Sequence, residues 1–411
     1  MLKRLAVRGF KSLQDVTIAF PRMAVLFGPN AAGKSNLLDA IQALSRIGTA
    51  RTLAEALSEP IRGYPIEAFS FPSGGMAQIL GAPSARFEFE ADLVRQKDAF
   101  CYRVAVQIAP NSGALGVSDE YLSALSKEGQ PRGIAAIQQI DGRLRVRRKS
   151  KSGKPRYEPL HQNYAVLSDL RLGKPLHSAI EQARAELSDW RTYYLDPRVA
   201  MRTAQPPADV RDIGVLGGEI APFLYKLQAE HPKHSQAVSR TVRSIIPSIQ
   251  GLTIDLDKRR GSLDLLIRQG GVDYSSRIVS EGTLRVLALC AIAVNPWGGS
   301  LIAFEEPENG VHPRRLELIA QLLLSLALEQ GRQVVVTTHS PLFCDAVLRA
   351  ARSRPDDVGL FNVRREGHAT VVEAFPDSLP LFSDQEIATA LTSGVDDGLF
   401  QSLLLRGLLD E

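Results

Sequence analysis

The stretch that decides the fold reads Gly28-Pro29-Asn30-Ala31-Ala32-Gly33-Lys34-Ser35. It fills every fixed position of the pattern G-x-x-x-x-G-K-[ST], the phosphate-binding loop that joins a strand to a helix. Its context also fits, because the apolar run 23–27 precedes it and apolar residues follow at helical spacing up to Ile47. The alternative, a glycine-rich turn that binds nothing, is disfavoured because spacing and context agree.

Each residue type in this loop has a chemical reason. The glycines let the backbone turn its N–H groups toward a phosphate, and the following helix adds a partial positive charge. Lys34 would reach the β- and γ-phosphates, and the Ser35 hydroxyl would ligate Mg²⁺. The residues expected to contact the nucleotide are Asn30, Ala31, Ala32, Gly33, Lys34, Ser35 and Asn36.

Two carboxylates follow the apolar run 300–304, at Glu305 and Glu306. A metal-dependent NTPase places such acids beside its phosphate loop, where Glu305 would hold Mg²⁺ and Glu306 would orient or deprotonate the attacking water. The alternative is an acidic helix start ahead of Pro313. Ser35 and Glu305 are 270 positions apart, so we expect a nucleotide fold that is split by an insertion.

Two further motifs accompany these. His339 directly follows the strand expected at 333–338, at the sheet edge where parallel sheets bind ligands. Ser280 and Gly282 open the apolar helix expected at 281–294 and predict a second anion site. By itself this second motif favours a plain helix cap, in which Ser280 accepts a backbone hydrogen bond.

Composition narrows the class of protein. The 411 residues are 44% hydrophobic and 23% charged, with a net charge of +4, which excludes a wholly disordered or fibrous chain. Three widely spaced cysteines form neither a disulfide framework nor a zinc pattern. Apolar runs are too short for a membrane span, and the start lacks a signal peptide's apolar region. We expect a soluble cytoplasmic protein with no membrane partner.

The order of elements predicts an α/β fold with a mostly parallel sheet, antiparallel N-terminal strands and a short inserted segment of strands and helices. Expected boundaries give an N-terminal lobe at 1–114, an inserted subdomain at 115–238, a C-terminal lobe at 239–375 and a tail at 376–411. Asp141-Gly142 predicts a hairpin turn. A short helix is expected at 118–125 with Ser118 as its cap, and a longer one at 176–194.

The segment from Arg143 to Arg156 is strongly basic, with eight basic residues in fourteen and no acid. Candidate nucleic-acid contacts are Arg143, Arg145, Arg147, Arg148, Lys149 and Lys151. Such contacts would be salt-sensitive and independent of sequence. The alternative is a solvated hairpin tip, and the absence of interleaved aromatic residues makes stacking on single strands less supported.

Taken in order, GPNAAGKSN, VSEGT, LIAFEEPENGVHP and VVVTTHSP resemble the motifs of ABC-type ATPase heads of the SMC/RecF/OLD superfamily. The opening LKRLAVRGFKSLQDVTIAF resembles the first strands of that group, and the whole looks most like stand-alone bacterial OLD-branch, AAA-labelled ATPases. The resemblance covers roughly 1–110 and 240–375. It implies a head that binds ATP and Mg²⁺.

The resemblance assigns roles to residues. Glu305 takes the place of the usual Walker B aspartate, Glu306 is the catalytic base and His339 the switch histidine. Ser280 and Gly282 act on the ATP of a second subunit, so a homodimer is implied, with larger assemblies left open. Lys11 lies near the nucleotide, and the loop Asn309-Gly310-Val311-His312 contacts the second subunit.

Departures from the family pattern matter as well. The signature reads SEGT, and Gln78 is only a poor match to a Q-loop. Only 72 residues follow His339, too few for a Toprim nuclease domain, so we predict no intrinsic nuclease activity.

The sequence therefore predicts an ATPase that dimerises on ATP and senses or acts on duplex DNA or another nucleic acid with a separate effector. A role in phage defence is suggested by the resemblance alone. One alternative is an ATP-dependent protein-binding switch that controls an effector or toxin without touching nucleic acid. Another, a transporter ATPase subunit, is opposed by the long insertion.

Overall fold

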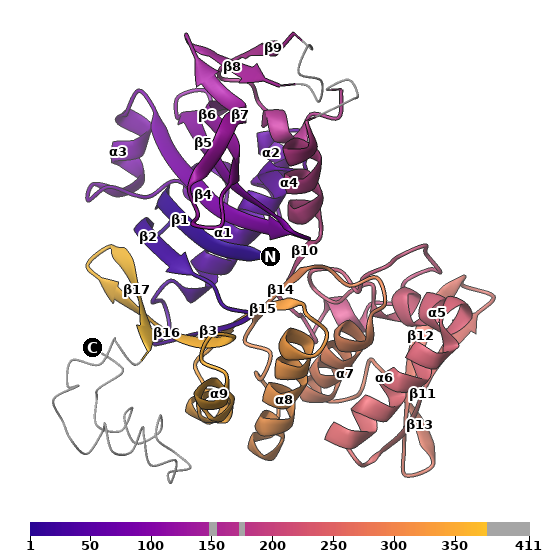
Figure 1. Ribbon diagram of the computed structural model, residues 1–411. Helices are drawn as coiled ribbons and strands as arrows, with labels where there is room; N and C mark the ends of the chain where they lie inside the picture. The colour runs from indigo at the N-terminus through magenta and orange to yellow at the C-terminus, as the bar shows by residue number, and fades with distance from the viewer. Residues whose placement is uncertain (148–153, 172–176, 376–411) are drawn as a thin grey trace, which may run out of the picture. The chain divides into compact units, whose positions relative to one another are not determined.

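The computed structural model describes residues 1–147, 154–171 and 177–375, which form two compact units (Figure 1). Unit 1 comprises Met1–Pro21, Gly28–Trp190 and Phe361–Ala374, and unit 2 comprises Arg22–Phe27, Arg191–Leu360 and Phe375. The lobe and subdomain boundaries expected from the sequence stay a prediction. The expected tail at 376–411 lies outside the described residues.

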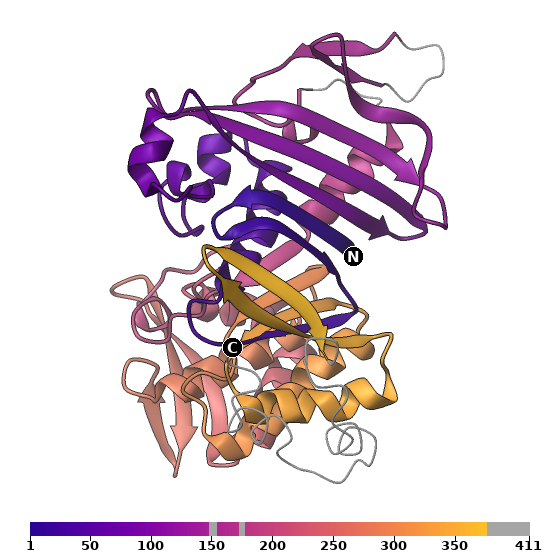
Figure 2. The ribbon, with the colours of Figure 1, turned by 90° about the vertical axis from the view of Figure 1, so that its left-hand side faces the viewer.

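Unit 1 is built on an eight-stranded sheet of order β2-β1-β4-β5-β6-β7-β8-β9, whose neighbouring strands are antiparallel. Its strands are β1 (Leu2–Phe10), β2 (Leu13–Ala19), β4 (Ala85–Arg95), β5 (Asp98–Ala109), β6 (Ala114–Leu125), β7 (Pro131–Ile140), β8 (Arg143–Val146) and β9 (Arg156–Pro159). Figure 2 shows the long central strands of this sheet. The expected Asp141-Gly142 hairpin is confirmed, with both residues at positive φ between β7 and β8.

Alternation along β4 sorts the two faces of the sheet. Phe87 and Phe89 point to the buried face, where they pack with Phe10. Helices α1 (Lys34–Ile47) and α4 (Ser178–Ser188) contact each other, and α4 also contacts β4, β5 and β6. Unit 1 also contains α2 (Leu53–Ala56), α3 (Gly75–Gly81), η1 (Pro65–Ala68), η2 (Val166–Ser168), residues 361–366 of β16 (Val358–Glu366) and most of β17 (Ala369–Phe375).

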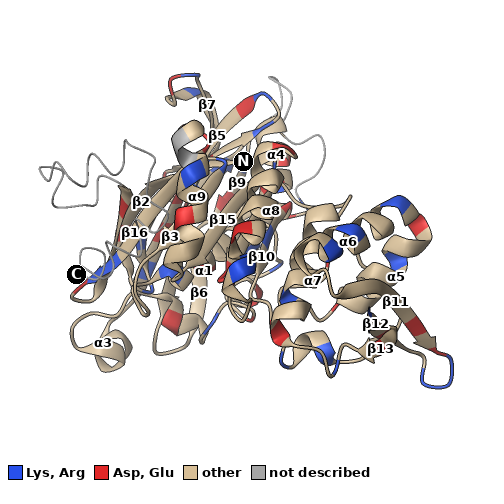
Figure 3. Cartoon of the chain, turned by 90° about the horizontal axis from the view of Figure 1, so that it is seen from below, with Lys and Arg blue, Asp and Glu red and all other residues tan. Residues whose placement is uncertain are grey.

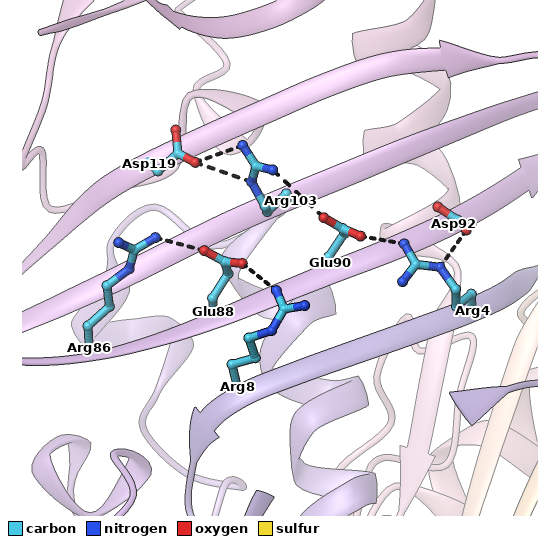
Figure 4. Close-up of polar contacts among 8 residues, drawn as sticks. All are labelled: Arg4, Arg8, Arg86, Glu88, Glu90, Asp92, Arg103 and Asp119. Atoms are coloured by element: carbon cyan, nitrogen blue, oxygen red, sulfur yellow. Dashed lines mark hydrogen bonds and ion pairs between the residues drawn. The ribbon is translucent and has the colours of Figure 1, made fainter. Parts of the chain in front are cut away.

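The other face of the sheet carries a ladder of alternating charges (Figure 4). Arg4 bridges Glu90 and Asp92, and Arg103 bridges Glu90 and Asp119. A second chain of ion pairs places Glu88 between two arginines, in the order Arg8, Glu88, Arg86. Four arginines and four carboxylates thus neutralise one another across β1, β4, β5 and β6.

Unit 2 contains the parallel part of the fold. Its strands are arranged in the order β10-β14-β15-β3, followed by the first residues of β16. Strand β15 lies between β14 and β3 and pairs with both in parallel. The strands are β10 (Trp190–Tyr193), which begins in unit 1, β14 (Leu301–Glu305), β15 (Gln333–Thr338) and β3 (Met23–Phe27). All six residues of β15 are buried, as expected for a central parallel strand covered on both faces.

A smaller antiparallel sheet completes unit 2, in the order β11-β12-β13. These strands are β11 (Ile249–Asp257), β12 (Ser262–Gln269) and β13 (Val272–Ser275). The helices are α5 (Ile220–Glu230), α6 (Pro232–Ile245), α7 (Glu281–Val294), α8 (Leu316–Leu328) and α9 (Pro341–Ser353), with η3 (Ala200–Arg202) and η4 (Pro313–Arg315). Helix α7 is apolar nearly all round and lies in the centre of the core of unit 2.

The predicted α/β fold class is confirmed, but two local expectations are wrong. Residues 118–125 form no helix, because they pair along β5 as part of β6, and this tertiary pairing outweighs a local cap signal. The helix expected at 176–194 ends at Ser188, after which Trp190–Tyr193 form β10. The three cysteines are buried thiols that form no disulfide. In the described part of the chain, every helix is too short or too polar to cross a membrane.

Candidate nucleotide site

The phosphate loop has the backbone that its glycines allow. The angle φ is 144° at Gly28 and 108° at Gly33, and Ala31 between them also adopts a positive φ of 64°. A Cβ added at Gly28 would lie 2.0 Å from the carbonyl oxygen of Val363, and one added at Gly33 would lie 2.0 Å from Thr370 Oγ1. The loop is therefore packed against the β16–β17 hairpin so closely that neither position has room for a side chain.

Lys34 is the first residue of α1, and its side chain turns back over the loop. Its ammonium donates hydrogen bonds to the carbonyl oxygens of Gly28 (2.7 Å) and Pro29 (2.8 Å), and the residue is buried. Ser35 follows in the first turn of α1 and is half-buried. Gly33, at the N-cap, has no side chain to cover the first turn, which suits an anion. A bound phosphate would replace the two carbonyl oxygens as the hydrogen-bond partner of the ammonium.

Three hydroxyl and amide groups brace the loop from outside. Thr370 Oγ1 donates to the carbonyl oxygen of Ala32 (2.9 Å) and lies 2.7 Å from Ser12 Oγ. Asn36 Nδ2 donates to the same Ser12 hydroxyl (2.7 Å). The loop conformation thus depends on Ser12 and Thr370, which the sequence analysis missed. Their separation of 358 positions leaves no local pattern that would reveal them.

A pocket of about 580 Å³ adjoins the loop within unit 1. Ser12 and Asn36 form part of its wall, and the basic side chains around it are Lys11, Arg62, Arg365 and His368. Lys11 Nζ pairs with the buried carboxylate of Asp39 at 2.6 Å, and Arg62 pairs with the same carboxylate at 3.1 Å. The expected position of Lys11 near the nucleotide remains a prediction, and this pocket is the observation that favours it.

The candidate catalytic acids lie at the carboxyl edge of the parallel sheet in unit 2. Glu305 ends β14 and pairs in register with Thr337, and Glu306 follows with φ at 43°, a left-handed conformation that is uncommon outside glycine. The backbone N–H of Glu306 donates to the carbonyl oxygen of Thr337 at 3.0 Å. This turn directs the Glu306 carboxylate to His339 Nδ1, 3.1 Å away. The two residues expected to act in catalysis are therefore in direct contact.

Glu308 is a third acid at this edge, which the sequence analysis did not single out. Its Oε1 accepts a hydrogen bond from Thr338 Oγ1, and its Oε2 is buried without a hydrogen-bond partner. Burial raises the pKa of the Glu308 carboxyl above its ordinary value. Glu308 therefore links the turn after β14 to the end of β15, one residue before His339.

The signature residues and the expected subunit-contact loop lie together. Ser280 caps α7 by accepting a hydrogen bond from the N–H of Thr283 at 3.2 Å, as the plain-cap alternative requires. Gly282 is buried, and a Cβ there would lie 2.3 Å from the carbonyl oxygen of Gly310. The N-terminus of α7 therefore packs backbone to backbone on the loop 309–312. That loop is tied to Glu306, whose carbonyl oxygen accepts from Asn309 N at 3.0 Å.

Arg202 holds the approach to α7 in place. Its guanidinium donates to the carbonyl oxygens of Pro197 (2.7 Å), Ser276 (3.1 Å) and Val279 (2.8 Å), and also to that of Arg277. Two segments that are distant in sequence are thereby joined directly before the signature. Sequence reasoning missed Arg202 because its partners are backbone carbonyls, which no residue pattern reports.

The basic run divides between described and undescribed residues. Arg148, Lys149 and Lys151 lie outside the described residues. Arg143 is exposed, whereas Arg145 donates to Gln138 Oε1 (3.1 Å) and Arg147 to the carbonyl oxygen of Ile134 (2.8 Å). Of the three candidate arginines that the structure describes, two therefore also stabilise the sheet, and the nucleic-acid contacts stay a prediction.

The donor set fits magnesium and a nucleotide. The hydroxyl of Ser35 and the carboxylate of Glu305 are hard oxygen donors, the kind of ligand that Mg²⁺ prefers. Among the described residues no cluster of three histidines, cysteines or carboxylates would hold a metal without phosphates. The glycine backbone of the loop and the ammonium of Lys34 supply what a phosphate needs.

The strand–loop–helix and the parallel sheet define the class as a P-loop α/β protein. The chain belongs to the family described as "AAA domain, putative AbiEii toxin, Type IV TA system", whose model matches residues 23–345. This confirms the expected membership among AAA-labelled P-loop proteins, while placement in the OLD branch stays a prediction.

Among solved structures, the chain is similar to the SMC head domain from Thermotoga maritima, with 14% identity, 91% of this chain and 98% of that chain covered, and a TM-score of 0.42. It is also similar to the Smc head domain with an extended coiled coil bound to the C-terminal domain of ScpA from Pyrococcus furiosus, with 12% identity, 91% and 96% coverage, and a TM-score of 0.49. Among curated proteins the search found no match.

Proposed function

We propose that the chain binds ATP with Mg²⁺ and hydrolyses it. The observation that carries this proposal is the contact between Glu306 and His339 at the carboxyl edge of the parallel sheet. Phe27, the last residue of β3, pairs with Thr338 at that edge, and the phosphate loop starts at the next residue. Ligands bind at this edge in open α/β sheets.

Each residue has a role that its surroundings support. Lys34 would bind the β- and γ-phosphates. The Ser35 hydroxyl and the Glu305 carboxylate would each offer an oxygen ligand to Mg²⁺, which would offset phosphate charge. Glu306 accepts a proton from the attacking water, and His339 orients its carboxylate through the 3.1 Å contact. Asn30, Ala31, Ala32, Gly33 and Asn36 form the loop around the phosphates, and the pocket beside Lys11 accommodates the rest of the nucleotide.

Phosphate release by the purified chain tests this proposal. Lys34→Ala should abolish ATP binding, whereas Glu306→Gln should keep binding and lower turnover by about 10²–10⁴-fold. Glu317→Gln, an exposed position on α8, is the matched control and should change nothing. Full turnover in Glu306→Gln would remove Glu306 as the base.

We further propose that two copies associate through the surface around the signature residues Ser280 and Gly282. Val199 and Ile278 are 67% and 71% exposed, and Arg202 joins the segments that carry them directly before Ser280. Exposed apolar side chains beside a packed motif favour burial against a second copy. Glu306→Gln with ATP should give a dimer by light scattering, and Ile278→Asp in that background should give a monomer. A monomer in both would contradict the dimer.

Nucleic acid is the proposed trigger of this ATPase, and a separate effector the proposed output. Arg143 is exposed for phosphate contact, and the basic run around it carries no acid. A second candidate function is a protein-binding switch. Ile134 (61% exposed) and Tyr157 (50%) lie on the same sheet edge as Arg145, and apolar, aromatic and arginine side chains are enriched at protein interfaces. The family description, which names a toxin–antitoxin system, suits this switch as well.

Neutralising Arg143, Arg145 and Arg147 to glutamine separates the two functions. Under the main proposal, DNA-stimulated ATP turnover should fall. If the chain is instead a protein-binding switch, DNA should not change ATP turnover in either the parent or the variant.

A further inference from the structure

The outer face of α6 is a stripe of basic and polar side chains. Lys233, Gln236, Arg240 and Arg243 are all exposed. At about 100° per residue they fall within an arc of about 80°, opposite the buried stripe of Val238, Val242 and Ile245. Lys233 and Arg243 are ten residues apart, or about 15 Å along the helix axis. Figure 3 shows the basic positions of α6 on unit 2.

No acid balances this stripe. Helix α6 contains three cations and no aspartate or glutamate from Pro232 to Ile245. In the described part of the chain, Lys233, Arg240 and Arg243 form no ion pair, although Arg243 Nε donates to the carbonyl oxygen of Ser239 at 3.2 Å. A solubilising helix face ordinarily mixes both signs in i,i+4 pairs, so this face differs from an ordinary solvated surface.

A second basic group lies in the turn between the first two strands of the small sheet. The turn between β11 and β12 reads Asp257-Lys258-Arg259-Arg260-Gly261, and its three cations are exposed. Only three residues join the end of α6 to the start of β11, and α6 contacts β11. Strand β11 therefore runs back along α6, and the turn lies toward the end where Lys233 is found. Asp257 accepts hydrogen bonds from the backbone N–H groups of Arg259 and Arg260, and it also forms an ion pair with the Arg260 guanidinium at 3.7 Å, which leaves Lys258 and Arg259 as the cations without an ion pair in the described chain.

We propose that this surface, the outer face of α6 with the β11–β12 turn, binds the phosphate backbone of duplex DNA without reading its sequence. Nucleic-acid interfaces are polar and positively charged, whereas protein interfaces have an apolar centre. Residues 232–261 contain no exposed large hydrophobic side chain. The same absence opposes a membrane surface, which requires apolar side chains for insertion. The inference rests on the proposed nucleic-acid function and adds to it a second contact surface besides the basic run at Arg143.

Packing gives the surface a route to the ATPase centre. Helix α6 contacts α7, whose Gly282 lies on the loop that is tied to Glu306. DNA bound at α6 therefore acts on the helix that carries the signature, and we expect DNA to change ATP turnover through it.

The test measures binding of a labelled 30-base-pair duplex to the full chain over a range of salt concentrations. The variant Lys233→Gln/Arg240→Gln/Arg243→Gln removes three phosphate contacts, and glutamine is a comparable helix former. The slope of log affinity against log salt should fall by about 2.7, or 0.9 for each contact. The ratio of the parent's DNA affinity to that of the variant should therefore fall about 40-fold between 50 mM and 200 mM salt. Lys258→Gln/Arg259→Gln should lower the slope further.

The matched control is Arg268→Gln/Arg349→Gln/Arg354→Gln. It makes the same change in net charge on unit 2, at exposed arginines that are ion-paired with Asp273, Glu317 and Asp357. This control should leave the slope unchanged, and basal ATP turnover should be unaffected in both triple variants.

Four results would overturn the inference. Equal slopes for the α6 variant and the parent would place DNA elsewhere, and loss only in the Arg143 variant would place it on the basic run, with the proposed function intact. Equal loss in the control would reduce the effect to net charge. No DNA binding, with α6-dependent binding to vesicles of anionic lipid, would make the occupant a membrane. Absence of ATP turnover in the parent would instead refute the ATPase proposal and leave the binding result to stand alone.

Discussion

Gly282→Ala is the substitution that tests the backbone packing beneath the signature. The new Cβ would lie 2.3 Å from the carbonyl oxygen of Gly310, 3.1 Å from its carbonyl carbon and 3.4 Å from Val311 Cα. An unstrained C···O contact is about 3.3 Å, so α7 or the loop must move by about 1 Å. The loop is held at both ends, because Asn309 N donates to Glu306 O and Val311 N to Glu308 O, each at 3.0 Å.

The magnitude follows from two opposing effects. Overpacking costs about 1–3 kcal/mol, and the better helix propensity of alanine recovers up to about 1 kcal/mol. A net loss of about 1–2 kcal/mol lowers the unfolding midpoint of a domain of this size by about 2–8 °C. Because the movement reaches Glu306, turnover should fall together with stability.

Calorimetry and phosphate release measure both effects on the same preparation. Gly251→Ala is the control, since Gly251 has an ordinary φ and open space around its Cβ position, and its substitution should stay within about 0.5 kcal/mol. A Gly282→Ala chain with the parent's midpoint and turnover would refute the reasoning, because it would show that the loop yields without cost.

Three further predictions follow from single contacts. Thr370→Val removes the hydrogen bonds to Ala32 and Ser12 while keeping the side-chain volume, so ATP affinity by calorimetric titration should fall several-fold; unchanged affinity would mean that the glycines alone fix the loop. His339→Ala should lower turnover with little change in ATP affinity, and an equal loss of affinity would make His339 a binding residue. Burial raises the pKa of Glu120 to about 7, so the folded chain retains a proton that the unfolded chain releases near pH 4.5. Stability should therefore fall by on the order of 3 kcal/mol as pH rises from 4.5 to 7, and Glu120→Gln should remove this decline; parallel pH profiles for parent and variant would contradict it.

The sequence pattern predicted those helices and strands whose own residues form continuous apolar runs. Helix α7 and the parallel strands β14 and β15 lie within a residue of their expected bounds, because continuous apolar runs leave few alternatives. Residues 118–125 were misassigned because their side-chain pattern is weak and pairing with β5 decides their conformation.

The candidate site divides in the same way. Motifs singled out Lys34, Glu306 and His339 as candidates, because phosphate binding and water activation require particular residue types at fixed positions. The roles of Ser12 and Thr370 were not predicted, because a hydroxyl that stabilises a loop from a distant part of the chain leaves no periodic signal in the sequence. The buried position of Glu308 was not predicted, because a further acid after Glu305 and Glu306 resembles the solvated start of a helix.

The brace between the phosphate loop and Thr370 has a consequence for synthesis on the ribosome. The loop is translated more than 300 codons before the hairpin that holds it. β3, from the same early segment, pairs with β15, which is also translated late. A nascent chain that has not yet released residue 370 therefore lacks the contacts that brace the loop. Stabilisation of the loop by a bound nucleotide can therefore begin only after residue 370 has left the ribosome.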